Sequence, residues 1–269
     1  MRAAALVRAG WPEAMHAEWT KLRTLASTGW LLLGAVVFTV AVSVAAVASA
    51  RCRAGAVCQV DPAKLSLTGI YLGQAVVAIL AVLAISGEYS TGMMRVSLTA
   101  MPRRTAVLAA KATVVTGVVL PAGAIAVLGS VLAGRLILPG QGFSAANGYQ
   151  AVSLGSPSVL RAAAGSVLYL ALIGLLSLGA ATAVRDSAVA IAVVLGLLYL
   201  FPIIAGVVTD PAWQRHLNQI GPMNAGLAIQ ATSGLRSLPL SPWAGLGVLA
   251  AWAGGALLAG GVVLRLRDA

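Results

Sequence analysis

Long uninterrupted apolar stretches alternate with short polar segments along the whole chain. Seven stretches free of Asp, Glu, Lys and Arg are long enough to cross a bilayer as a helix, which takes about 20 apolar residues. The stretch 136–160 differs in content, because its Pro, Gly, Asn and Gln residues are typical of turns and loops. Six predicted spans remain, at about 30–50, 65–87, 112–134, 161–184, 187–208 and 242–264.

The apolar residues within the spans are continuous, as in the segment 75–80 (AVVAIL). A membrane-spanning strand would instead alternate apolar and polar residues with a period of two. The pattern therefore predicts an all-α integral membrane protein with six transmembrane helices in a single transmembrane domain, 1–269. Pro121 and Pro202 fall inside spans, where a kink is expected.

The composition supports the same class. Hydrophobic residues make up 59% of the chain and charged residues only 9%, against roughly 25% charged in soluble domains. These values exclude a soluble globular enzyme, a disordered protein and a small disulfide-stapled secreted domain. The polar start and the apolar core of the first span are both too long for a signal peptide, so we expect an uncleaved span.

The distribution of basic residues sets the expected orientation. With the N-terminus inside, the cytoplasmic segments hold eleven of the 18 Lys and Arg residues and the outer segments hold seven. This bias predicts the cytoplasmic (inner) membrane as the location, with both termini cytoplasmic. The net charge of +11 is then a topology signal with affinity for anionic lipid heads, and no nucleic-acid partner is expected.

Cys52 and Cys58, the two cysteines of the chain, lie in the short segment 51–64. In the expected orientation this segment faces the oxidising side of the membrane, where a disulfide is stable. We expect the two residues to form a small disulfide clip; two free thiols are the alternative. No metal site is expected, because the two histidines, His16 and His216, lie far apart in the sequence.

The segment of about 12–26 has the pattern of an amphipathic helix on the cytoplasmic membrane surface. Pro12 suits the first helical turn, and Met15, Trp19, Leu22 and Leu25 recur at helical spacing. A plain membrane anchor explains most of these residues.

The loop between the second and third spans, about 88–104, carries a second short helix in the expected cytoplasmic region. Met94, Leu98 and Met101 form one apolar stripe, and Arg95, Arg103 and Arg104 provide basic flanks. Methionine-rich helices with basic flanks are suited to docking another protein. A solvated loop whose arginines only enforce the topology is an equally good interpretation.

The last outer segment begins with Asp210-Pro211, a helix-capping pair, and is broken at Gly221-Pro222. It predicts outer short helices at about 211–231, with Trp213 as an interfacial anchor. An ordered loop that caps the bundle is the simpler interpretation.

Several kinds of chemistry have no counterpart in the sequence. There is no phosphate-binding loop, and no carboxylate falls in the middle of a predicted span, as ion-coupled transporters require. Motifs of membrane hydrolases and metal-dependent transferases are also missing, so no catalytic residue is predicted. No pattern identifies substrate-binding residues or a cargo.

Three stretches resemble the permease subunits of type 2 ATP-binding-cassette (ABC) exporters, particularly those of actinobacteria. The likeness runs in order along essentially the whole chain and also includes its end, LRLRDA. The stretches are 16–24 (HAEWTKLRT) ahead of 28–30 (TGW), 87–95 (GEYSTGMMR) ahead of 102–104 (PRR), and 184–188 (VRDSA) opening a span that ends in Phe201-Pro202.

The resemblance implies roles for two groups of residues. The N-terminal amphipathic helix corresponds to an elbow helix beside the ATPase, and the loop after the second span holds a cytoplasmic coupling helix that sits in a groove of the ATPase. The elbow residues are Glu18, Trp19, Lys21 and Arg23, and the coupling residues carried over from the family are Glu88, Tyr89, Gly92 and Arg95.

The resemblance further implies that six spans form half a transporter. A second permease copy, identical or a close paralogue, and two copies of a separate ABC ATPase subunit are the expected partners, together with membrane lipids. The partner ATPase would bind ATP and Mg, and this chain would bind no cofactor and would not be an enzyme. A membrane-embedded lipid-modifying enzyme and a non-transporting structural or sensory membrane protein are the alternatives.

Overall fold

The computed structural model describes residues 15, 19–20, 26–52, 60–90, 104–144, 147, 149 and 151–266. Every regular element in this part of the chain is helical, and six helices are long and apolar enough to cross a membrane. The predicted fold class is thereby confirmed. The spanning helices are α3 (Ala26–Ser49), α5 (Ile70–Ser90), α7 (Arg104–Ile137), α8 (Pro157–Val184), α9 (Ser187–Val207) and α12 (Pro242–Leu266).

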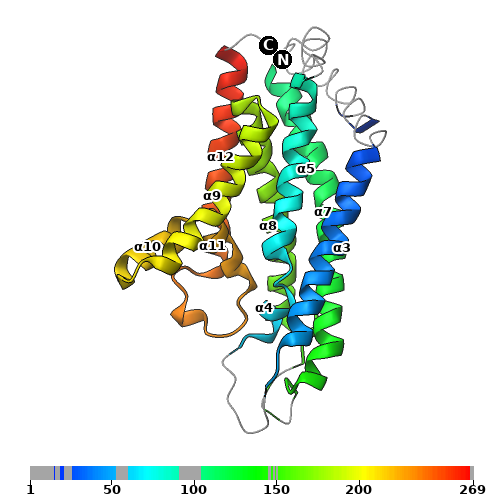
Figure 1. Cartoon of the computed structure of the whole chain (residues 1–269), viewed down its shortest axis with the longest axis vertical. Coiled ribbons are helices and arrows are strands. Elements are labelled where there is room, and N and C mark those ends of the chain that lie inside the picture. The colour runs from blue at the N-terminus through cyan, green and yellow to red at the C-terminus, as the bar shows by residue number, and fades with distance from the viewer. Residues whose placement is uncertain are drawn as a thin grey trace, which may run out of the picture.

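The six helices run up and down as one elongated bundle (Figure 1). At the upper end in this view, α5 ends, α7 begins, and α8 turns into α9 through Arg185 and Asp186. The lower end carries the short helix α4 (Pro62–Ser66) and the 3₁₀ turn η1 (Leu138–Gln141). The stretch 136–160, expected as loop, contains that turn and irregular chain before α8 begins.

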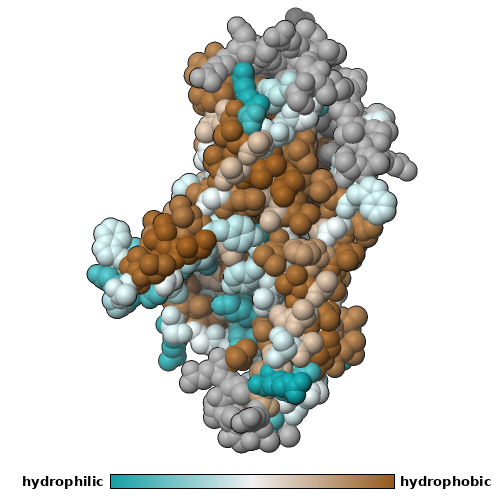
Figure 2. Space-filling model, viewed as in Figure 1, coloured by the Kyte–Doolittle hydropathy of each residue, from teal (hydrophilic) through white to brown (hydrophobic). Residues whose placement is uncertain are grey.

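Helix α8 is the centre of the bundle and packs against α5, α7, α9 and α12. Its closest approach is to α12, where a Cβ added to Gly179 would lie 2.5 Å from the Ala256 carbonyl carbon. Only glycine lets two backbones approach so closely, as small residues do in membrane helix pairs generally. The outward faces of α3, α9 and α12 carry exposed apolar side chains, and Figure 2 shows this apolar surface on the flanks of the bundle.

The second span begins at Ile70, later than the expected residue 65. Residues 62–66 form the separate helix α4, which Asp61 caps by accepting hydrogen bonds from the amides of Ala63 and Lys64. A turn then carries the chain against α3, where the Gly69 amide donates to Ser43 Oγ at 3.1 Å. The separate cap and this tight contact divide one apolar stretch into two helices.

The third span begins at Arg104, earlier than the expected residue 112. The sequence pattern places the start of this span directly after the charged residue Lys111, because an unpaired lysine is costly within a membrane. Lys111 is instead buried and ion-paired, so the helix continues through it. Pro121 in α7 and Pro202 in α9 lie inside continuous helices.

Two short helices follow α9, in the segment where the sequence predicts them. Helix α10 (Pro211–Ile220) is capped by Asp210, whose carboxylate accepts from the Ala212 amide at 2.7 Å. Helix α11 (Pro222–Leu227) follows and continues into the 3₁₀ turn η3 (Ala228–Gln230). Helix α10 projects sideways from the bundle with Trp213 exposed, whereas α11 packs on α9 and α12 (Figure 1).

The first lower loop is joined to the turn after α7. The Cys52 amide donates to the Gln141 carbonyl at 2.9 Å, and a Cβ at Gly142, where φ is +93°, would clash with the Cys52 carbonyl oxygen. Cys52 belongs to a disulfide rather than being a free thiol. Its predicted partner, Cys58, lies outside the described residues.

Candidate functional site at the end of α5

The structure describes only some of the predicted site residues. In the elbow segment Trp19 is helical and exposed, whereas Glu18, Lys21 and Arg23 lie outside the described residues. Arg104 is the first residue of α7, and Glu88 and Tyr89 lie in the last turn of α5. The remaining predicted coupling residues are outside the described part of the chain: Gly92, Met94, Arg95, Leu98 and Arg103.

Glu88 forms a buried ion pair with Lys111. Lys111 Nζ lies 2.8 Å from Glu88 Oε1, and the two side chains are only 2% and 10% exposed, respectively. Lys111 sits two turns into α7, so the pair joins the last turn of α5 to the first turns of α7. The pair links these two helices, and loss of either member is costly because the other charge is buried.

Tyr89, the next residue along α5, contacts the turn between α8 and α9. The Arg185 guanidinium carbon lies 5.6 Å from the centre of the Tyr89 ring, a cation–π distance. Arg185 Nη2 also donates to the Val263 carbonyl of α12 at 3.4 Å. One side chain therefore connects the ends of α5, α8 and α12.

Arg185 adopts an unusual backbone conformation at this contact. Its φ of +64° is in the left-handed region, which costs a residue with a side chain about 1–2 kcal/mol. Arg185 ends α8 by donating its amide to the Ala181 carbonyl, and the adjacent Asp186 caps α9 through the Val189 amide. The two-residue turn is thus fixed by both helices and by the Tyr89 contact.

We refer to Glu88, Tyr89, Lys111 and Arg185 as the Glu88 cluster. Apolar side chains from α5, α7, α8, α9 and α12 pack around its inner side and separate it from the middle of the bundle. The sequence predicted Glu88 and Tyr89 as site residues but assigned no site role to Lys111 or Arg185. One feature of the sequence could have identified Lys111. It lies seven residues after Arg104 with no charged residue between them, so the two residues share one face if the helix is continuous.

The contacts of the Glu88 cluster run between helices. The described residues hold no group of three or more His, Cys, Asp or Glu side chains that could bind a metal. The cluster's ion pair, cation–π contact and hydrogen bond connect four helix ends. The last turn of α5 is therefore linked directly to α7 and to Arg185, and through Arg185 to α12.

A second polar group lies inside the bundle, on α5, α8, α9 and α11. Gln74 is fully buried, accepts a hydrogen bond from the Tyr169 hydroxyl and donates to Met223 Sδ at 3.1 Å. The Tyr71 carbonyl accepts from Gln74 Nε2 at 3.0 Å and also from the Tyr199 hydroxyl. These contacts attach the short helix α11 to the centre of the bundle.

Asp61 connects α4 to the segment after η3. Its carboxylate accepts hydrogen bonds from the Thr232 amide, the Thr232 hydroxyl and the Ser233 amide, at 2.5, 2.6 and 2.9 Å. Burial by itself would raise the pKa of Asp61, but these hydrogen bonds and that from the Lys64 amide hold the pKa below its ordinary value. The ionised Asp61 carboxylate therefore links α4 to the segment that contains Thr232 and Ser233.

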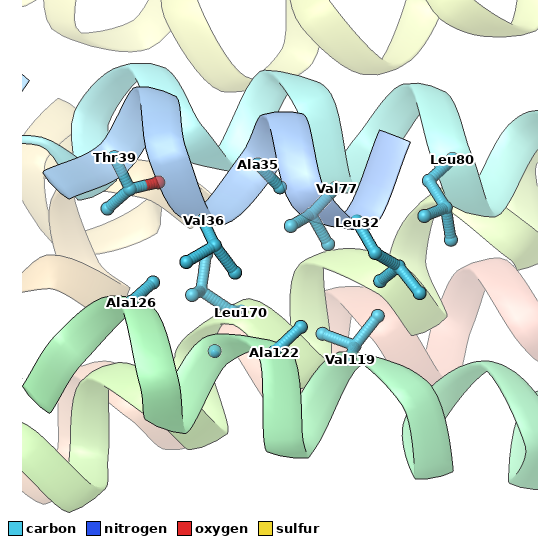
Figure 3. A pocket seen from close by; sticks show the side chains of 11 residues that line it. Leu32, Ala35, Val36, Thr39, Val77, Leu80, Val119, Ala122, Ala126 and Leu170 are labelled. Atoms are coloured by element: carbon cyan, nitrogen blue, oxygen red, sulfur yellow. The ribbon is translucent and has the colours of Figure 1, made fainter. Parts of the chain in front are cut away.

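An apolar pocket lies between α3, α5 and α7, with Leu170 of α8 at its base (Figure 3). Its volume is about 10 Å³, at the lower limit for a single water molecule. Thr39 is the polar residue among those that line it. The pocket is a gap in helix packing and offers no site for a ligand.

No family model matches the sequence, and a search of curated proteins finds no similar one. The functional conclusions therefore rest on the residues and on their geometry.

Proposed function

We propose that this chain is the membrane-spanning permease subunit of a type 2 ABC exporter, driven by ATP hydrolysis on a separate ATPase subunit. The observation that carries the proposal is the Glu88 cluster, which lies where α5 leads into the predicted coupling loop and ties that point to α7, α8 and α12. The resemblance of the segments around Glu88 and Arg185 to that family agrees with this assignment.

The proposed mechanism uses this connection between helices. ATP binding closes a pair of ATPase subunits, and their movement displaces residues 91–103, which dock on the ATPase. Because Glu88 pairs with Lys111 and Tyr89 contacts Arg185, the displacement moves several helices as a unit and shifts the permease between its conformations. ATP shifts the transporter toward one conformation only to the extent that it binds that conformation more tightly than the other.

The remaining parts of the assembly follow from the same proposal. A second permease copy completes the translocation path, and Mg and ATP are bound by the partner ATPase. In this proposal the upper end of the bundle in Figure 1 and both termini face the cytoplasm, and the lower end with α4 and η1 faces outward. The location is the cytoplasmic membrane.

Gentle purification of the tagged full chain from its native membranes, with mass spectrometry and an ATPase assay, tests the proposal. We expect a stoichiometric partner that carries a phosphate-binding loop and hydrolyses ATP. A clean oligomer without such a partner would overturn the proposal. Turnover of lipid by that preparation without ATP would instead identify a membrane-embedded enzyme.

A charge reversal tests the docking surface itself. Arg95→Glu is expected to abolish partner retention and ATPase stimulation while leaving membrane insertion intact. Arg135→Glu, at the exposed far end of α7, is the matched control and should leave both unchanged. Equal retention of the ATPase by both variants would show that Arg95 does not take part in docking.

A further inference from the structure

Two adjoining cavities open on the lower half of the molecule, between α4, α5 and the short helices α10 and α11. Their volumes are about 230 and 380 Å³, and both are lined by Lys64 of α4 and Tyr71 of α5. Drug-sized ligands occupy pockets of about 300–1,000 Å³. Figure 2 shows hydrophilic surface over this part of the molecule, between apolar flanks. We call the two hollows together the Lys64 cavity.

The Lys64 cavity contains an available cation. Lys64 is exposed and forms no ion pair within the described part of the chain. Asp61 also lines the larger hollow, but its carboxylate already accepts hydrogen bonds from the amides of Lys64 and Thr232 and from the Thr232 hydroxyl. The carboxylate keeps its negative charge but its oxygens are held by these donors, so the Lys64 ammonium is the cation that a ligand would meet.

Uncharged hydrogen-bond donors face the same space. Asn218 of α10 and Asn224 of α11 line the smaller hollow, and Asn224 Nδ2 donates to Asn218 Oδ1 at 2.6 Å. Because Asn218 Oδ1 accepts this hydrogen bond, the Asn218 Nδ2 group remains able to donate its hydrogens to a ligand. The Tyr71 hydroxyl makes no hydrogen bond to another described residue, whereas its backbone carbonyl is held by Gln74 and Tyr199. Ammonium, amide and hydroxyl donors together match the oxygens of a phosphate or carboxylate.

The walls opposite these donors are apolar. Leu227, Leu238 and Leu240 line the smaller hollow beside the two asparagines. The neighbouring α10 exposes Trp213, which is typical of the membrane–water interface, and the last turns of α9 expose Ile203 and Val207 as lipid-facing residues do. The Lys64 cavity therefore combines a polar pocket at interfacial depth with an adjacent apolar surface.

We propose that the Lys64 cavity binds the acidic headgroup of an amphiphile, with Lys64, Asn218 and Tyr71 on the phosphate or carboxylate oxygens and the apolar tail along Leu238 and Leu240. The surrounding membrane and the cargo of a permease are two sources of such a molecule. The inference does not depend on an ATPase partner, since binding is a property of this chain alone.

Native mass spectrometry of the full chain in detergent tests the proposal directly. Dioleoyl phosphatidylglycerol and dioleoyl phosphatidylcholine, which share their acyl chains, are titrated separately, and bound lipids are counted. We expect one phosphatidylglycerol molecule to be retained about tenfold more tightly than phosphatidylcholine, because both carry a phosphate but the choline cation of phosphatidylcholine offsets the phosphate charge beside Lys64. Equal retention of the two lipids would overturn the proposal.

Three variants separate the cavity from general surface charge. Lys64→Gln should reduce phosphatidylglycerol retention to the phosphatidylcholine level, and Leu238→Trp should do the same by filling the hollow without changing any charge. Arg135→Gln removes an exposed cation at the same end of the bundle, outside the cavity, and should retain the preference. An equal loss in Arg135→Gln would show that surface charge alone attracts the lipid.

Competition identifies the class of ligand. Dodecyl phosphate, with one chain and a free phosphate, should displace the bound phosphatidylglycerol at a comparable concentration, which would place single-chain amphiphiles among the ligands. Failure to displace it would mean that the lipid is held elsewhere. Displacement by inorganic phosphate at the same concentration would contradict the role of the apolar wall and overturn the amphiphile assignment.

Discussion

Lys111 Nζ lies 2.8 Å from Glu88 Oε1, although the two residues belong to helices separated by the predicted coupling loop. Lys111 is two turns inside α7, and Glu88 is in the last turn of α5. Helix α5 ends at Ser90, two residues after Glu88, and α7 begins at Arg104, seven residues before Lys111. The two ends of the coupling loop are thereby fixed to one another by a buried charge pair.

Replacing Lys111 by methionine should destabilise the protein by about 3–5 kcal/mol, because the buried Glu88 carboxylate then loses its ion pair with Lys111. Thermal unfolding of the purified chain in detergent measures the effect. The double variant Glu88→Gln/Lys111→Met should recover most of the loss. Arg135→Met, at the exposed end of the same helix, should change stability by no more than about 0.5 kcal/mol. Similar unfolding temperatures for Lys111→Met and the native chain would contradict the buried pair.

The left-handed backbone conformation of Arg185 predicts that glycine at this position gives a more stable protein than alanine does. Both Arg185→Gly and Arg185→Ala remove the contacts with Tyr89 and Val263, but only glycine adopts a φ of +64° without strain. Arg185→Gly should therefore be more stable than Arg185→Ala by about 1 kcal/mol. Thermal unfolding of the two purified variants compares them, and a more stable alanine variant would rule out the left-handed conformation.

Asp61 predicts a specific loss of stability in acid. Its pKa in the folded chain is below the ordinary 3.8, so its contribution is present above that value and is lost as the pH falls through the lowered pKa. Asp61→Asn should cost about 1.5–3 kcal/mol at neutral pH, the value of hydrogen bonds to a charged group. Unfolding temperatures measured from pH 7 down to about pH 3 should converge for the two proteins. A constant difference across this range would show that the charge of Asp61 is not involved.

Gly179 tests the close approach of α8 to α12. A Cβ at this position would lie 2.5 Å from both the Ala256 carbonyl carbon and the Leu257 amide nitrogen, so Gly179→Ala must push the helices apart. We expect a loss of about 1–3 kcal/mol in thermal unfolding. Gly254→Ala on α12 is the control, because nothing lies within 4 Å of a Cβ there. Equal stability of the two variants would mean that the helices are farther apart.

Much of the fold could be predicted from local sequence, and the exceptions are instructive. The bilayer selects apolar stretches of about 20 residues, so six spans could be identified without knowing how they pack. The same reasoning missed the start of α7, because it placed Lys111 outside the membrane-spanning helix. It also joined α4 to α5, since the contact of Gly69 with Ser43 cannot be seen in one segment alone.

The candidate site was only half predictable for the same reason. Glu88 and Tyr89 were identified from the segment that contains them, whereas Lys111 and Arg185 gained their roles from contacts across the bundle. Lys64, Tyr71 and Asn218 carried no signal at all in the sequence, because a cavity exists only when α4, α5 and α10 are brought together.

The sequence by itself determined the class of the protein, its six apolar helices and the capped short helix that begins after Asp210. These features depend on composition, spacing and neighbouring residues, which are local properties. Only the tertiary structure decided which charges are paired, which glycines let helices approach closely and where donors converge around Lys64. The physical reason is that such contacts join residues far apart in the chain, and helix packing alone sets the distances between them.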